Sequence, residues 1–91
     1  AICSCKGLDM TLGVTDSNEK DSLIKQAMLA SAERCILALD SEKFDKKSFV
    51  KVCKAKNIDI IVTDCEPSEK WTGFCSENNI ELVYNKSIER K

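Results

Sequence analysis

The stretch Cys35-Ile36-Leu37-Ala38-Leu39, followed at once by Asp40-Ser41-Glu42-Lys43-Phe44, decides the fold class of this 91-residue chain. A continuous apolar run that an acidic residue stops is typical of a strand covered on both faces in a parallel sheet. In such sheets ligands lie beyond the carboxyl ends of the strands. The stretch therefore predicts an α/β protein with a polar, ligand-facing turn from Asp40 to Lys43.

Upstream of this stretch, the sequence predicts a strand, a loop and a helix. We expect a short strand over residues 1–5 and a loop over residues 6–15, because Gly7 and Gly13 tolerate unusual backbone angles. Asn18 can cap the following helix by accepting a hydrogen bond from an amide in its first turn. The helix is expected to be amphipathic, since its apolar and small residues recur at three and four positions: Leu23, Ile24, Ala27, Met28, Ser31 and Ala32.

Downstream, two more strands enclose a second helix. Residues 45–57 fit a strand or a short helix equally well, and residues 58–63 are expected to form the next strand. A helix then opens at Pro67 and ends at Asn78-Asn79. The chain closes with a strand over residues 80–84 and a polar tail over residues 85–91. This alternation predicts a layered α/β fold with a mostly parallel sheet and flanking helices.

The balance of charges argues against a surface that binds nucleic acid. The chain has 14 Lys and Arg against 15 Asp and Glu, a net charge of -1 and no His. This removes the field that draws a domain onto a phosphate backbone. Lysines still gather between residues 43 and 56, either as a solvated face or as a contact for a phosphate-bearing ligand: Lys43, Lys46, Lys47, Lys51, Lys54 and Lys56.

The six cysteines favour a reducing compartment. Cys3 and Cys5 alternate in a strand-like segment and the others are isolated, as free thiols are when they serve as small core residues in the cytosol. Disulfides and a metal site stay open as alternatives, although C-x-x-C pairs and His are missing from the sequence. No run reaches the length of a membrane span and no leader is present, so we expect a cytoplasmic protein without membrane contact.

Three polar clusters follow predicted strands and should meet at one edge of the sheet. The clusters are Gly7-Leu8-Asp9, Asp40 to Lys43 and Thr63-Asp64. Asp9 and Asp40 can accept hydroxyl groups of a sugar, while Lys43 can meet a phosphate as a point charge. Gly13 lets backbone amides approach an anion. The alternative is a local role, in which Lys43 lies on the surface and each of three aspartates caps a turn: Asp16, Asp40 and Asp64.

These motifs, in this order, resemble the effector domain of DeoR-type repressors of sugar metabolism. They are Gly7-Leu8-Asp9, Gly13-Val14-Thr15, Asp21 with Lys25, Asp40 to Phe44, and Thr63-Asp64, and they span nearly the whole chain. Asp21 departs from the pattern, since the family usually has Glu there. The upstream Gly-Thr-Thr and Gly-Gly loops and the winged helix-turn-helix of the family are absent from this sequence, which starts at Ala1 rather than Met. Residues 1–91 thus resemble the C-terminal portion of such a domain, cut from a longer protein.

The resemblance implies a fold, a ligand and partners. The fold is Rossmann-like and similar to that of ribose-5-phosphate isomerases and CoA transferases. The ligand is a phosphorylated sugar, DNA is bound only by an N-terminal domain outside this chain, and the protein is a homo-oligomer. No cofactor and no catalytic or metal-ligating residue is implied. Effector binding is assigned to Gly7, Asp9, Gly13, Thr15, Lys25, Asp40 and Lys43.

Two other functions are compatible with the same residues. One is a sugar-phosphate isomerase of the same fold, in which a Glu on the helix before Asp-x-x-Lys supplies the base. Counting back from Asp40, Lys25 holds that place here, and a lysine can bind an anion but replaces a carboxylate base poorly. The other is an oligomerisation module without a ligand, in which Trp71 and Phe74 lie at a subunit contact instead of covering the sheet.

Overall fold

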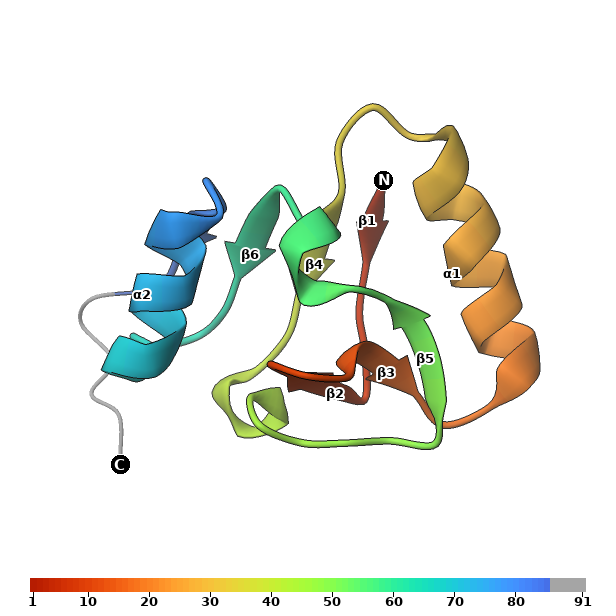
Figure 1. The fold of residues 1–91 in the computed structure, drawn as a ribbon, viewed down its shortest axis with the longest axis horizontal. Helices are drawn as coiled ribbons and strands as arrows, with labels where there is room; N and C mark the ends of the chain where they lie inside the picture. The colour runs from red at the N-terminus through yellow and green to blue at the C-terminus, as the bar shows by residue number, and fades with distance from the viewer. Residues whose placement is uncertain (86–91) are drawn as a thin grey trace.

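The larger of two sheets carries the strands that the sequence predicts (Figure 1). In the computed structural model, which describes residues 1–85, its strands pair in parallel in the order β1-β4-β6-β7. They are β1 (Ile2–Cys3), β4 (Ile36–Ala38), β6 (Ile60–Val62) and β7 (Glu81–Val83). Residues 86–91, most of the predicted polar tail, lie outside the described residues. The mostly parallel α/β fold is confirmed, with β1 at one edge of the sheet.

A smaller antiparallel sheet replaces the predicted loop over residues 6–15, so that prediction is wrong. Its strands, in spatial order, are β2 (Gly7–Asp9), β3 (Gly13–Asp16) and β5 (Val50–Cys53). The turn between β2 and β3 needs Gly13, whose φ of 81° is one that other residues rarely adopt. A Cβ atom at Gly13 would also lie 2.3 Å from the carbonyl oxygen of Cys53. The glycines that indicated a loop instead permit close strand pairing.

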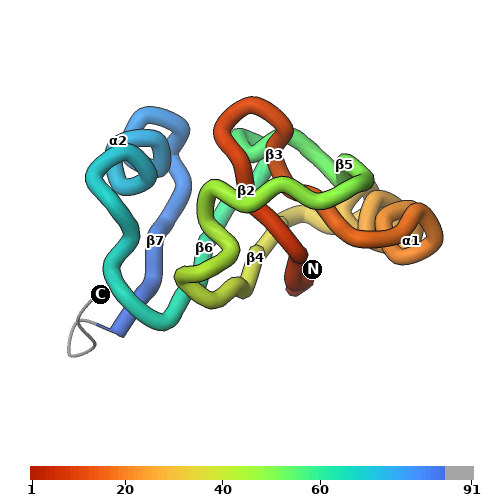
Figure 2. The backbone as a smooth tube through the Cα atoms, turned by 90° about the horizontal axis from the view of Figure 1, so that it is seen from below, coloured from red at the N-terminus to blue at the C-terminus, as the bar shows by residue number. Residues whose placement is uncertain are grey.

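The remaining elements are two α-helices and two short 3₁₀ turns. They are α1 (Glu19–Ser31), α2 (Glu69–Glu77), η1 (Ser41–Lys43) and η2 (Ala55–Asn57). Asn18 Oδ1 accepts a hydrogen bond of 2.8 Å from the amide of Asp21, which confirms the predicted cap of α1. Residues 45–57 contain both alternatives, the strand β5 and the turn η2. The two α-helices lie at opposite ends of the molecule (Figures 1 and 2).

The periodicity of helix α1 predicts that its apolar stripe packs against the protein. In the structure the opposite, polar face packs inward instead. Leu23, Ile24 and Met28 face outward and are exposed to 56%, 52% and 42%, whereas Leu29 is partly buried against the core. Ser22 is buried instead, because its hydroxyl and the Gln26 amide both donate to the carbonyl oxygen of Lys51 on β5, at 3.1 and 3.2 Å. The polar face of the helix therefore supplies hydrogen-bond donors to the unpaired edge of β5. The apolar face of the helix stays exposed.

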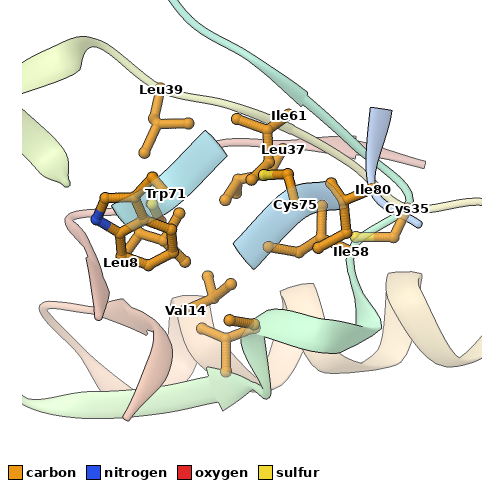
Figure 3. Packing of buried hydrophobic residues seen from close by; sticks show 13 residues of the cluster. Leu8, Val14, Cys35, Leu37, Leu39, Ile58, Ile61, Trp71, Cys75 and Ile80 are labelled. Atoms are coloured by element: carbon orange, nitrogen blue, oxygen red, sulfur yellow. The ribbon is translucent and has the colours of Figure 1, made fainter. Parts of the chain in front are cut away.

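The core lies between the two sheets. Figure 3 shows Leu8 and Val14 on the side of the smaller sheet and Leu37 and Ile61 on the side of the larger one. Trp71 of α2 is almost completely buried in this cluster. Its ring centroid lies 5.6 Å from that of Phe74, which is partly buried. The expectation that these aromatic residues cover the sheet is thus confirmed.

The six cysteines, all within the described residues, form no disulfide bond. Four of them are buried, and burial raises the pKa of Cys5 to about 11 and that of Cys35 to about 12. The thiols of Cys5 and Cys35 therefore stay protonated at neutral pH and pack as small apolar groups. Across residues 1–85, no cluster of three or more His, Cys, Asp or Glu is placed to hold a metal ion. Nor does any helix in that range have the length and apolar character to cross a membrane.

Candidate functional site

The turn after β4 presents Asp40 and Lys43 to solvent. Their side chains are 52% and 35% exposed, and Asp40 Oδ2 lies 3.8 Å from Lys43 Nζ. The other carboxylate oxygen of Asp40 accepts a hydrogen bond of 2.9 Å from the amide of Glu42, which confirms that this aspartate caps the turn. One oxygen of Asp40 thus builds the turn, while the second forms a loose, open pair with the ammonium group of Lys43.

The turns after β4 and β6 are joined, as expected for neighbouring parallel strands. Asp64 Oδ1 accepts hydrogen bonds from the amide of Ser41 at 2.7 Å and from the hydroxyl of Thr63 at 3.2 Å. Loss of hydration acts to raise the pKa of Asp64, but these hydrogen bonds outweigh it and hold that pKa below its usual range. The charged carboxylate of Asp64 therefore holds Ser41, the first residue of η1, in place through a hydrogen bond.

The third predicted cluster, Gly7-Leu8-Asp9, contacts the turn after β4 through its backbone. The carboxylate of Asp9 does not take part in this contact. Leu8 of β2 pairs with Phe44, and its carbonyl oxygen accepts a hydrogen bond of 2.7 Å from the amide of Asp45. Asp9 instead bends into the tip of the hairpin, where Oδ2 accepts from the amides of Thr11 and Leu12, each at 2.9 Å. These amides, that of Leu12 foremost, lower the pKa of Asp9. The structure places β2 beside the turn and the Asp9 carboxylate at the hairpin tip.

Gly7, Gly13 and Thr15 shape the hairpin from inside. The Thr15 hydroxyl is buried, donates to the carbonyl oxygen of Gly7 at 3.2 Å and accepts from the amide of Ser48 at 3.0 Å. A Cβ atom at Gly7 would lie 2.3 Å from the carbonyl oxygen of Lys46. These positions bring the segment after η1 close to β2, so their role in any site is to set its shape.

Lys25 lies apart from the turn, in an ion pair that the sequence did not reveal. Its ammonium group donates to Asp16 Oδ2 and, at 2.7 Å, to the carbonyl oxygen of Ser4 at the end of β1. The side chain of Lys25 is 20% exposed and that of Asp16 only 2%. Burial acts to raise the pKa of Asp16, but the hydrogen bond and charge of Lys25 outweigh it, so that pKa lies below its usual range.

Asp16 was predicted as a turn cap, and it is one, because Oδ1 accepts a hydrogen bond of 2.8 Å from the amide of Ser17. Sequence reasoning missed its ion pair with Lys25 because the two residues belong to a strand and a helix that were not expected to touch. The one available signal was the run Gly13-Val14-Thr15 that leads into Asp16, which the structure shows to be buried. A charged residue that continues such a run needs a partner of opposite charge.

The clustered lysines had two interpretations, a solvated face and a contact for a phosphate-bearing ligand, and exposure is compatible with both. Five of the six are exposed, and the side chain of Lys43 is exposed to 35%. Lys51, Lys54 and Lys56 line a pocket of about 210 Å³ together with Met10 and Phe74. This pocket lies between the hairpin tip, β5 and α2, and Lys43 is not among its lining residues.

Comparison with known proteins identifies the family. A family model described as the DeoR C terminal sensor domain matches residues 1–65. The L-fucose operon activator of Haemophilus influenzae is 29% identical over 83 residues, which cover 91% of this chain and 33% of that protein. The transcriptional repressor GlcR of Bacillus subtilis is 28% identical over 79 residues, or 87% of this chain and 31% of the repressor. The deoxyribose operon repressor of Escherichia coli K12 is 27% identical over 84 residues, with coverage of 92% and 33%.

These relatives are named as regulators of transcription, and this chain spans about a third of their length. The family match includes the hairpin, α1, the turn after β4 and Thr63-Asp64, the elements that hold the candidate residues. Because it extends over residues 1–65 of a chain of 91, the chain belongs to the family of DeoR C-terminal sensor domains.

Proposed function

We propose that residues 1–91 are the C-terminal portion of the effector-sensing domain of a bacterial regulator of sugar metabolism. The domain binds a phosphorylated sugar and thereby controls DNA binding by a separate domain outside this chain. The observation that carries the proposal is the open pair of Asp40 and Lys43 on a turn at the carboxyl edge of the parallel sheet. We call residues Asp40–Lys43 the effector turn.

The chemistry of the effector turn fits a phosphorylated sugar. Lys43 offers a point charge to a phosphate, and the Asp40 oxygen that faces Lys43 can accept sugar hydroxyl groups. At 3.8 Å and this exposure the pair itself contributes only about 0–1 kcal/mol, so a ligand can replace it at little cost. In this proposal Gly7, Asp9, Gly13 and Thr15 shape the hairpin that borders the site.

Lys25 supports a sensor rather than an isomerase. It occupies the position at which the isomerases carry their base, and its ammonium group is already committed to Asp16 and to the carbonyl oxygen of Ser4. The ammonium group is engaged as a hydrogen-bond donor to these two acceptors, and a lysine replaces a carboxylate base poorly. It lines a pocket of about 290 Å³ with Ile2 and Met28, so part of its surface stays within reach of a ligand.

The uncovered face of α1 supports the assignment of residues 1–91 as part of a larger sensor domain. Within the described residues, β1 pairs with β4 alone, which leaves its other edge open. Ile2 of that strand and the outward-facing Ile24 and Met28 line one continuous pocket. In proteins about three times as long, such a surface is a natural place for the rest of the sensor domain to pack.

We further propose a homo-oligomer in the bacterial cytoplasm, where operator DNA lies.

Isothermal titration calorimetry tests the proposal on the intact sensor domain, with a panel of phosphorylated pentoses and hexoses. We expect a saturable heat for at least one compound, and a loss of at least tenfold in affinity for Lys43→Ala, the size of about 1.4 kcal/mol. Lys54→Ala is the matched control, because Lys54 belongs to the same lysine cluster but lies outside the effector turn. Heat that flows steadily in proportion to protein would indicate turnover and replace the sensor with an enzyme.

A further inference from the structure

Asp45, two residues beyond Lys43, has an unusual backbone and unusual partners. Its φ is 63°, in the left-handed region that glycine favours. Its carboxylate Oδ1 accepts hydrogen bonds from Lys70 Nζ at 2.6 Å and from the indole nitrogen of Trp71 at 3.1 Å. Both donors belong to the first turn of α2. A strained residue with two specific partners on another element is held in place for a reason other than local backbone preference.

The same residue ties the effector turn to the smaller sheet. The Asp45 amide donates to the carbonyl oxygen of Leu8 at 2.7 Å, next to the bridge between Leu8 and Phe44. The Phe44 ring packs against that of Trp71, with ring centroids 5.3 Å apart. Asp45 and Phe44 thus join the downstream end of the effector turn to β2 on one side and to α2 on the other.

The upstream end of the turn is connected to α2 as well. The amide of Ser41 donates to Asp64, and the chain runs from Asp64 over Pro67 directly into α2. Both ends of the turn are therefore fixed to the segment between β6 and the first turn of α2. A displacement of Lys43 must strain the bonds to Asp45 or to Asp64, or move α2 with it.

We propose that Asp45 is a positioning residue that couples the effector turn to α2 through Trp71 and Lys70. This inference rests on the proposed function of the turn and adds the route by which occupancy reaches the rest of the fold. Trp71 is the only tryptophan of the chain and is almost completely buried. A change in its hydrogen bond to Asp45 can therefore be followed through the signal of its indole N–H group.

Nuclear magnetic resonance of the intact sensor domain tests the coupling without any ligand. The indole N–H signal of Trp71 is assigned by its loss in Trp71→Phe. In Asp45→Gly, which relieves the left-handed backbone but removes the acceptor, we expect this signal and the amide signals of Ser41 and Lys43 to shift. Asp45→Asn tolerates the same backbone and keeps one acceptor, so it should remain folded and move these signals less. Lys54→Gln is the control and should leave them in place.

A second arm adds the phosphorylated sugar that binds in calorimetry, or inorganic phosphate if none does. In the wild type, the ligand should shift the indole signal of Trp71. In Asp45→Gly this shift should disappear and the affinity should fall about tenfold, the size expected from a lost charge-assisted hydrogen bond. Asp45→Asn should weaken binding in the same direction while its melting temperature stays close to that of the wild type.

The outcomes separate this inference from the proposed function. If the amides of Ser41 and Lys43 do not respond to Asp45→Gly, the coupling is refuted whether or not a sugar binds. If the amides respond but affinity for a bound sugar is unchanged, Asp45 does not position the site and the inference is also wrong. If no sugar or phosphate binds the wild type, the effector function fails, while a shift of the turn amides would still support the connection to α2.

Discussion

Replacement of Asp16 by Asn tests the ion pair that locks α1 against the hairpin. The substitution keeps the shape of the side chain and an acceptor for the amide of Ser17, but it removes the charge that faces Lys25. Breaking a fully buried pair costs about 3–5 kcal/mol. Because the Lys25 side chain is 20% exposed and keeps its bond to Ser4, we expect a smaller loss, about 2–3 kcal/mol in the free energy of unfolding.

The sign of the pH dependence follows from the direction of the pKa shift. The pKa of Asp16 is lower in the folded protein than in the unfolded chain, where it is about 3.9. The stabilisation is therefore complete above the unfolded pKa and is lost as the pH falls through the folded one. The difference in stability between the wild type and Asp16→Asn should be constant above about pH 5 and should shrink below about pH 4.

The assay is urea unfolding of the intact sensor domain, followed by fluorescence at several pH values. Lys25→Met and the double variant complete a mutant cycle, which isolates the interaction of the two side chains from their other contacts. A coupling energy below about 0.5 kcal/mol would refute the reasoning, since it is the size found for exposed pairs. So would a stability difference that persists undiminished below about pH 3 while both proteins remain folded.

Three further outcomes test other parts of the fold. Ile24→Asp should change the stability of the 91-residue chain by less than about 0.5 kcal/mol, yet destabilise a longer sensor domain that covers this face, as paired urea titrations would reveal. Gly13→Ala should cost more than about 1 kcal/mol, because it combines a positive φ with a contact to Cys53; an unchanged melting temperature would contradict the hairpin. Cys5 and Cys35 should react with a thiol reagent only after unfolding, when six thiols per chain should titrate; fewer would indicate disulfides.

The sequence predicted those elements whose signal is local. The apolar run from Cys35 to Leu39 and the cap at Asn18 each depend on neighbouring residues, and both are as expected. The hairpin was missed because β2 and β3 are short, contain glycine, and complete their sheet with β5, far along the chain. No alternation of apolar and polar residues over so few positions separates a strand from a loop.

The orientation of α1 shows a second limit. Periodicity locates an apolar stripe on a helix but does not tell which neighbour covers it. Here the hydrogen bonds of Ser22 and the ion pair of Lys25 decide which face turns inward. For the candidate site, too, local patterns could be predicted from the sequence and tertiary contacts could not. Asp40 and Lys43 could be predicted because strand ends define the edge of a parallel sheet, whereas the contacts of Lys25 with Asp16 depend on tertiary packing.

The polar face of α1 also protects part of an exposed strand edge. An unpaired strand edge exposes carbonyl and amide groups that can recruit a strand from another molecule. On β5 the carbonyl oxygen of Lys51 already accepts hydrogen bonds from Ser22 and Gln26, so the helix covers this pairing site on the edge of the smaller sheet. Substituting these two residues by apolar ones would remove both donors to this carbonyl oxygen and open it to pairing with a strand of another molecule.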